Sequence, residues 1–160
     1  MFISDKIIAA FNKQIGQEYS NALQYTSVAN WFAAEDLRLL AAVFYAQADE
    51  ERAHAKRFSD FLLASGARVE IPALIAVQNG FANAVEAAQL VFDAEQRTTR
   101  QINELADLAE TEKSHSAKQF LQWFIQEQVE EVATAATNLN LIKKASNNIF
   151  MVEAYLAHKG

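Results

Sequence analysis

Four long stretches of this chain place apolar residues at steps of three and four positions, the spacing of one face of an α-helix. The first runs from about Ser4 to Ala33, and the second runs from about Asp36, a plausible cap, to Ser65. The third runs from about Phe81 to Glu110 and the fourth from about Ser116 to Leu141. The pattern predicts a bundle of four helices. Its apolar stripes contain Phe11, Ile15, Ala22, Tyr25, Ala29, Phe32, Leu40, Phe44, Phe58, Leu62, Ala88, Phe92, Ile102, Leu105, Ala109, Leu121, Phe124, Ala135 and Leu139.

Two further segments complete the predicted architecture. The segment from Gly66 to Gly80 contains Pro72 and has no helical stripe, so it predicts an extended connection of about 15 residues. Fully extended, it could span roughly 50 Å, enough to run along a helix and join two parallel helices. A loose loop between antiparallel helices is the alternative. The amphipathic segment from Ile149 to Ala157 predicts a short fifth helix.

The composition favours helix throughout and a single domain. The chain has 160 residues, of which 51% are hydrophobic, enough for one continuous core across residues 1–160. Only four glycines and one proline interrupt it. The expected fold class is therefore all-α.

The charged residues and the lack of cysteine exclude several classes of function. The net charge of −6 argues against nucleic acid, which needs clustered Lys and Arg. The absence of cysteine rules out thiolate-ligated metals, so any metal must use oxygen and imidazole ligands. The N-terminus lacks the apolar segment of a signal peptide, and no stretch reaches about 18 apolar residues. We therefore expect a cytoplasmic protein that does not enter the membrane.

Each predicted helix also carries polar side chains inside its apolar stripe. A carboxylate on a core face costs several kcal/mol unless a partner compensates its charge. Any one of these residues could turn to the surface or pair with a neighbouring Lys or Arg, but the whole set needs a common partner. The six residues are Glu18, Glu51, His54, Glu95, Gln128 and Glu131.

The spacing of these residues predicts that they meet at one level of the bundle. Glu18 and Glu51 lie 33 positions apart around the turn between the first two helices, so in an antiparallel hairpin they have the same height. Glu95 and Gln128 are also 33 positions apart, around the turn between the last two long helices. A shift of 77 positions carries Glu18 onto Glu95, which indicates two facing half-sites.

The residue types favour two divalent metal ions. Residues at positions i and i+3 share a helix face, so Glu51 and His54 can direct a carboxylate and an imidazole at one ion. With a glutamate from each of two other helices, this approaches a di-iron carboxylate site. Four carboxylates balance the charge of two divalent ions. Oxygen and imidazole ligands suit iron or manganese, and redox chemistry would need iron.

Three strings of residues make the sequence similar to bacterial non-haem ferritins over essentially the whole chain. They are Asp49-Glu-Glu-Arg-Ala-His54, Glu95-Gln-Arg-Thr-Thr-Arg-Gln-Ile-Asn-Glu-Leu-Ala106 and Phe120-Leu-Gln-Trp-Phe-Ile-Gln-Glu-Gln-Val-Glu-Glu131, to which Glu18 followed by Tyr25 is added. The resemblance implies a ferritin-like four-helix bundle that stores and detoxifies iron. It also implies a di-iron ferroxidase centre within each subunit, which oxidises Fe(II) with O₂ or peroxide, and a hollow shell of twenty-four subunits that holds the ferric mineral.

The resemblance also implies roles for individual residues. Glu18, Glu51 and His54 would hold one iron, and Glu51 would bridge to a second iron held with Glu95 and Glu131. Gln128 would lie in or next to the ligand shell. Glu50, Glu127 and Glu130 match a third, cavity-side iron position, although they could be a solvated acidic face. Tyr25 matches a tyrosine close to the centre, although it could be an ordinary core residue with its hydroxyl satisfied.

The chain departs from the related bacterioferritins in two places. Arg52 stands where a haem-ligating methionine would be expected, and the two methionines are Met1 and Met151, so we expect no haem. Gln128 and Glu131 replace a second Glu-x-x-His pair, which favours iron that passes through over iron that stays.

Three alternatives compete with this interpretation. A di-iron oxidase that acts on an organic substrate would need a pocket beside the metals and usually a second histidine, and neither is visible in the sequence. A helical bundle whose inward acids bind no metal is the non-enzymatic alternative. A miniature ferritin with sites between subunits is disfavoured because the ligands converge within one chain.

Overall fold

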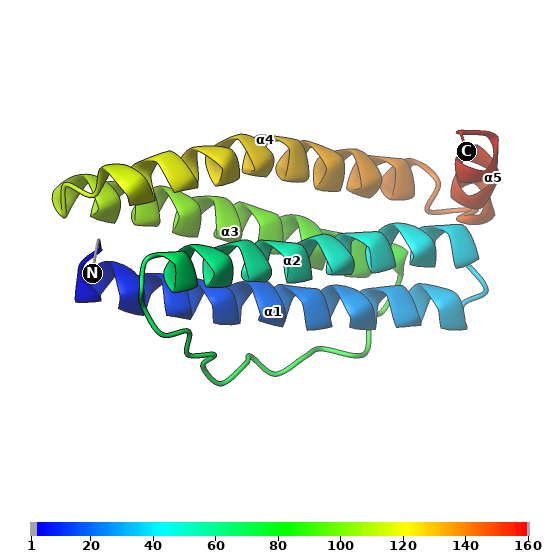
Figure 1. The fold of residues 1–160 in the computed structure, drawn as a ribbon. Coiled ribbons are helices and arrows are strands. Elements are labelled where there is room, and N and C mark those ends of the chain that lie inside the picture. The colour runs from blue at the N-terminus through cyan, green and yellow to red at the C-terminus, as the bar shows by residue number, and fades with distance from the viewer. Residues whose placement is uncertain (1–2, 160) are drawn as a thin grey trace.

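Five helices follow one another along residues 3–159, the part of the chain that the structure, a computed structural model, describes (Figure 1). They are α1 Asp5–Ala34, α2 Arg38–Ala64, α3 Ala84–Thr111, α4 His115–Lys144 and α5 Phe150–Lys159. The predicted all-α architecture, with four long helices and a short fifth one, is confirmed. Within these residues no helix has the length and apolarity needed to cross a membrane.

Three of the long helices begin at a side chain that caps their free backbone N–H groups. Ser4 accepts a hydrogen bond from the backbone N of Ile7, and Asn83 accepts one from the backbone N of Glu86. Ser114 does the same at the start of α4. Such caps are the usual signals that fix where a helix starts.

The start of α2 differs from the prediction. Asp36 does not cap it, because Asp36 lies in the turn with a left-handed φ of 60°, and the N-cap residue Leu37 has no side chain that can accept. Glu153 of α5 accepts instead from the backbone N–H groups of Leu39 and Leu40, at 3.0 and 2.8 Å. The short last helix therefore caps the second one.

The connection between α2 and α3 is a crossover that runs along α1 from one end of the bundle to the other (Figure 1). It leaves the end of α2 and reaches the start of α3 at the opposite end, so α2 and α3 run parallel. The predicted crossover is confirmed, and the alternative of a loose antiparallel loop is wrong.

Polar side chains on one face of α1 hold the crossover in place. Asn12 accepts from the backbone N of Glu70 at 2.9 Å and donates to the carbonyl oxygen of Arg68 at 3.3 Å. Gln24 makes the same pair of bonds with the backbone of Gln78, at 2.9 and 2.8 Å. Side-chain amides thus take the place of a neighbouring strand for this extended backbone.

The core consists of two apolar clusters at opposite ends of the bundle. One gathers around Phe32 and Phe44 and the other around Phe11 and Phe58. The predicted core residues are buried, except that Phe92 is only half-buried. Between the two clusters each long helix contributes polar side chains, so the bundle has a polar layer at mid-height.

Gly16 provides a test of the contact between α1 and the crossover. A methyl group on Gly16 would clash with Cγ of Pro72. Gly16→Ala is expected to lower the free energy of unfolding by about 1–2 kcal/mol, because overpacking outweighs the gain of replacing a helical glycine. Urea unfolding measures this change. Gly80→Ala is the control, since nothing lies within 4 Å of the added methyl group there. Equal stability of the two variants would contradict the packing of Pro72 on α1.

Candidate metal centre

The polar layer contains all six residues that the sequence predicted for a metal site. They come from all four long helices, and even the most exposed of them, Glu131, has only 5% of its surface accessible. Side chains of this kind are rarely buried without partners. Their convergence makes this layer the candidate centre.

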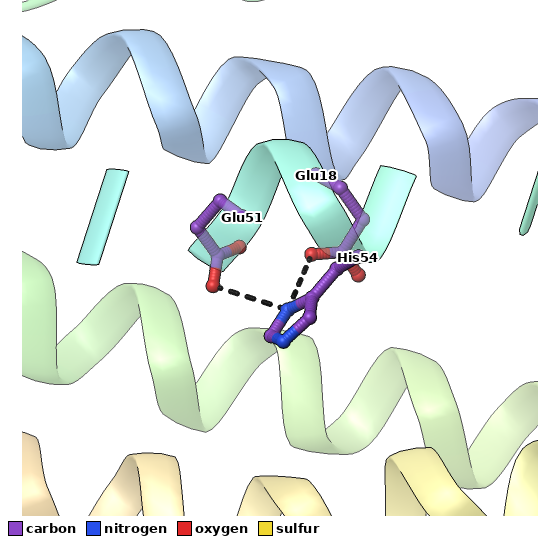
Figure 2. A group of neighbouring side chains, drawn as sticks. All are labelled: Glu18, Glu51 and His54. Carbon is purple, nitrogen blue, oxygen red and sulfur yellow. Dashed lines mark ion pairs between the residues drawn. The ribbon is translucent and has the colours of Figure 1, made fainter. Parts of the chain in front are cut away.

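The first group of ligands is formed by Glu18, Glu51 and His54 (Figure 2). Nδ1 of His54 lies 3.4 Å from Oε1 of Glu51 and 3.7 Å from Oε2 of Glu18. Figure 2 shows both carboxylates directed at this one nitrogen. Two oxygens and one nitrogen therefore face a common point.

The second group is formed by Glu51, Glu95 and Glu131, whose ligand atoms also lie within 4.8 Å of one another. Glu51 belongs to both groups, so its carboxylate stands between the two positions. The two groups together use one residue from α1, two from α2 and one each from α3 and α4.

The side of the centre that faces α4 has a third group. Nε2 of His54 lies 3.9 Å from Glu131 and 4.0 Å from Glu127. The sequence instead grouped Glu127 with Glu50 and Glu130, which are exposed. These three residues line one hollow of about 330 Å³ together with Gln47 and Glu131. Glu127 thus links the buried centre to the exposed acidic residues.

Glu95 is held by two neutral donors that the sequence also singled out. The hydroxyl of Tyr25 donates to Oε1 of Glu95 at 2.6 Å. Nε2 of Gln128 donates to Oε2 of the same carboxylate at 3.2 Å. Gln128 therefore touches a ligand of the second group, and Tyr25 is fully buried with its hydroxyl directed into the centre.

Three further buried residues lie beside the ligands and were not among the predicted site residues. Gln14 donates to Oε1 of Glu18 at 2.9 Å. Asn21 donates to Oε2 of Glu51 at 3.2 Å and to the hydroxyl of Thr98 at 3.0 Å. These residues lie on the same helix faces as the ligands, four before or three after them, so their spacing from Glu18 and Glu95 is the signal in the sequence that indicates them.

Several buried polar atoms of this layer have no hydrogen-bond partner. Among the described residues, Oε2 of Glu18, Nδ1 of His54 and Oε1 of Gln128 are buried and have no partner. Buried polar atoms in proteins are almost always satisfied. A cation between these oxygen and nitrogen atoms would supply the missing partner, so the residues fit bound metal.

The comparisons with known proteins agree with the geometry. The family model for the ferritin-like domain matches residues 8–145. The chain belongs to the ferritin family. The ferritin BfrB of Mycolicibacterium smegmatis is 40% identical to this ferritin chain, with 98% of this chain and 87% of the relative covered. The bacterial non-heme ferritin of Bacteroides fragilis is 30% identical, with 98% and 99% covered.

A solved structure extends the likeness to the fold. The open pore ferritin of Archaeoglobus fulgidus superposes on this chain with a TM-score of 0.93 at 30% identity, covering 97% of this chain and 96% of that one. The resemblance to bacterial non-haem ferritins and the ferritin-like fold are therefore confirmed, and the chain is a member of an iron-storage family.

Burial and mutual repulsion make the metal-free centre of this ferritin hold protons. Burial raises the pKa of Glu51 well above its usual value, and the charges of Glu18 and Glu95 raise it further. Burial also raises the pKa of Glu95, and it raises that of Glu131 to about 10, with Glu50 adding to the effect. Cations that enter would therefore displace protons.

The carboxylates of the centre also shift the pKa values of His54 and Tyr25. Burial by itself would lower the pKa of His54, but Glu18, Glu131 and Glu127 together raise it. Burial, followed by the charge of Glu95, raises the pKa of Tyr25 well above its usual value, so Tyr25 keeps its proton and remains a donor.

A depression on the surface reaches one edge of the centre. It has a volume of about 490 Å³ and is lined by His54, Glu127, Trp123 and Arg57, among others. The rings of Trp123 and His54 pack edge to face, with their centroids 5.6 Å apart. The guanidinium of Arg57 lies over the ring of Trp123. Trp123 is half-buried and packs against one of the two core clusters as well as against His54.

The raised pKa of Glu131 predicts how pH affects the metal-free protein. Between pH 4.5 and about 10 the folded state keeps a proton on Glu131 that the unfolded state releases, so stability falls as pH rises. Each such proton changes the free energy of unfolding by up to about 1.4 kcal/mol per pH unit. Glu131→Gln cannot ionise, so metal-free Glu131→Gln should lose less stability than the parent between pH 5.5 and 8.0 in urea unfolding.

Glu130→Gln, at the exposed neighbouring position, is the control for this measurement and should follow the parent protein. The explanation fails if Glu131→Gln loses as much stability over this pH range as the control.

Proposed function

We propose that this protein is a ferroxidase that oxidises Fe(II) to Fe(III) with O₂ or peroxide and stores the product. Iron is its substrate and its cargo. The observation that carries the proposal is the pair of buried ligand groups that share Glu51, with His54 in the first group. Four carboxylates beside two divalent ions approach electroneutrality, as a low-dielectric interior requires.

The chemistry needs two electrons at one place. Two Fe(II) ions supply the two electrons that reduce O₂ to hydrogen peroxide, or hydrogen peroxide to water. In this proposal Glu18, Glu51 and His54 hold one iron, and Glu51, Glu95 and Glu131 hold the other. Gln128 keeps Glu95 in place, and Tyr25 keeps a hydrogen bond on the same carboxylate. The protein supplies position and charge compensation, while iron carries the redox change.

The ferric product would leave past the acidic residues that lie near Nε2 of His54. Glu127 is within reach of Nε2 of His54, and Glu50 and Glu130 line the same hollow. We propose that these three residues form the third iron position. A group of carboxylates at the edge of the centre would attract cations and guide them inward, to the cavity of the shell.

We propose that the chain assembles into a hollow homo-oligomeric shell of twenty-four subunits. Large apolar side chains are exposed on α5 and on the crossover, where a lone subunit would leave them in water. They are Phe150, Met151 and Tyr155 on α5, and Ile71, Leu74 and Ile75 on the crossover. The cytoplasmic location expected from the sequence stays a prediction.

We also propose that the chain binds no haem. Arg52 occupies the position where a haem-ligating methionine would be expected. Its guanidinium donates to Asp49 at 2.6 Å and to the hydroxyl of Thr26 at 3.2 Å. Arginine is a poor ligand for haem iron because it keeps its proton at all ordinary pH values.

The alternative function is a di-iron oxidase that acts on an organic substrate. The depression lined by His54 and Trp123 favours it, because it would give a small molecule access to the edge of the centre. Its lining also includes the charged residues Glu50, Lys56, Arg57, Asp60 and Glu127, which do not favour an apolar substrate. The amount of iron retained distinguishes the two functions.

Aerobic iron loading tests the proposal. Fe(II) is added at many equivalents per subunit, and iron and protein are then measured in the high-mass fraction after size-exclusion chromatography. We expect far more than two irons per subunit in a large assembly, since the product is stored as mineral. Retention that stops near two would favour the organic-substrate oxidase, and no retention would contradict the di-iron site.

His54→Ala tests the centre itself. It removes the nitrogen ligand of the first group, so the initial rate of Fe(II) oxidation at two equivalents should fall by at least about tenfold. Stopped-flow absorbance of the ferric product measures this rate. His115→Ala is the matched control, because His115 is exposed at the start of α4. Equal rates in the two variants would show that His54 is not a ligand needed for Fe(II) oxidation.

Tyr25→Phe separates binding from oxidation. The variant keeps the ring in the core and loses the hydrogen bond to Glu95, a bond to a charged group worth about 1.5–3 kcal/mol. We expect an unchanged number of bound Fe(II) ions under anaerobic conditions and an oxidation rate lower by about tenfold. An unchanged rate would leave Tyr25 with a packing role only.

A further inference from the structure

Asn21 is a buried amide of α1 that contacts two other helices. It is 4% exposed, and it lies on the same face of α1 as Glu18, three positions later. One N–H of its amide group is directed at Glu51 of α2 and the other at Thr98 of α3. A single side chain thus connects α1, α2 and α3 inside the polar layer.

The orientation of this amide follows from its partners. In the ionised form that binds metal, the Glu51 carboxylate only accepts hydrogen bonds, so the atom of Asn21 that lies 3.2 Å from its Oε2 is the donor nitrogen. The same nitrogen lies 3.0 Å from the hydroxyl oxygen of Thr98, which accepts the second hydrogen. Because Thr98 is three positions after Glu95, the amide is anchored to α3, the helix that carries Glu95 of the second ligand group.

The two oxygens of Glu51 have different surroundings. Oε1 lies 3.4 Å from Nδ1 of His54, on the side of the first ligand group. Oε2 accepts from Asn21, and Glu51 is also a member of the second group with Glu95 and Glu131. The last torsion of a glutamate side chain is broad, so the carboxylate plane can rotate unless a neighbour fixes it.

We infer that Asn21 is a positioning residue that fixes the carboxylate plane of Glu51, so that one oxygen serves each of the two iron positions. The inference rests on the proposed function, since it needs two metal ions that share Glu51. Oε2 has two lone pairs, so it can accept the N–H of Asn21 and also bind a cation. Thr98 keeps the amide from rotating with the carboxylate.

Packing and helix stability alone do not explain an asparagine at position 21. Asparagine is a poor residue for a helix interior, and a buried amide is costly unless its N–H groups are bonded. Here both N–H groups are used, and one of them is spent on a ligand shared by the two groups. Leucine at this position would fill similar space with better helix propensity and no donor.

Anaerobic titration with Co²⁺ tests the inference. Co²⁺ stands in for Fe²⁺ without being oxidised, and its visible absorption reports the ligands of each ion as it binds. The test variant is Asn21→Leu combined with Thr98→Val, which removes the amide together with the hydroxyl that it bonds, so that only Oε2 of Glu51 loses a donor. We expect the first Co²⁺ to bind as in the parent and the second at least about tenfold more weakly, with an altered spectrum.

Ser20→Ala is the matched control. Ser20 lies next to Asn21 but faces the crossover, where it accepts from the backbone N of Ile75 at 3.0 Å. It should change neither binding step. Unfolding in urea is followed for both variants, so that a general loss of structure is recognised.

The outcomes separate this inference from the proposed function. If the parent protein does not bind two Co²⁺ ions per subunit, the proposed di-iron function fails. If the parent binds two and the double variant binds both equally well, or loses both steps to the same extent, the role of Asn21 is overturned. If the double variant does not fold, Thr98→Val alone must weaken the second step, and an unchanged titration of that variant overturns the role of Asn21.

Discussion

The rest of this structure depends on the burial of several carboxylates in one layer of a helical bundle. Glu18, Glu51, Glu95 and Glu131 are buried together, and burial with the charges of neighbouring carboxylates raises the pKa values of Glu51, Glu95 and Glu131. The apolar clusters on both sides of the layer must supply the free energy that keeps it closed. Burial of the metal-free carboxylates therefore costs free energy of folding, and bound cations would offset this cost.

The neutral side chains around these carboxylates have one property in common, which is that they donate hydrogen bonds. Gln14, Asn21, Tyr25 and Gln128 each direct an N–H or O–H at a carboxylate oxygen. Donors stabilise the ionised form of the carboxylate, which is also the form that binds metal. The surroundings of the ligands are thus arranged for the metal-bound state, while burial alone favours the protonated one.

Helix α1 serves both the site and the topology. Its inward face carries Glu18, Asn21 and Tyr25, and its outer face binds the crossover through Asn12 and Gln24. Because the crossover is held along α1 from Asn12 to Ser27, the third helix begins at the end of the bundle where the second begins (Figure 1). This parallel arrangement brings Glu95 to the level of Glu51. The extended segment is therefore as necessary for the site as the helices.

The sequence by itself determined the helices and the level of the site. A period of 3.6 residues and two turns at known positions allow few other arrangements, so the sequence alone predicts that Glu18, Glu51 and His54 lie together. What only the tertiary structure decided depends on side-chain torsions and on contacts between distant segments. Glu153 caps α2 from 113 positions away, where the sequence suggested Asp36, and the amide of Asn21 selects one oxygen of Glu51. Periodicity predicts which face of a helix a residue occupies, but it does not predict which atom of a neighbouring helix that residue contacts.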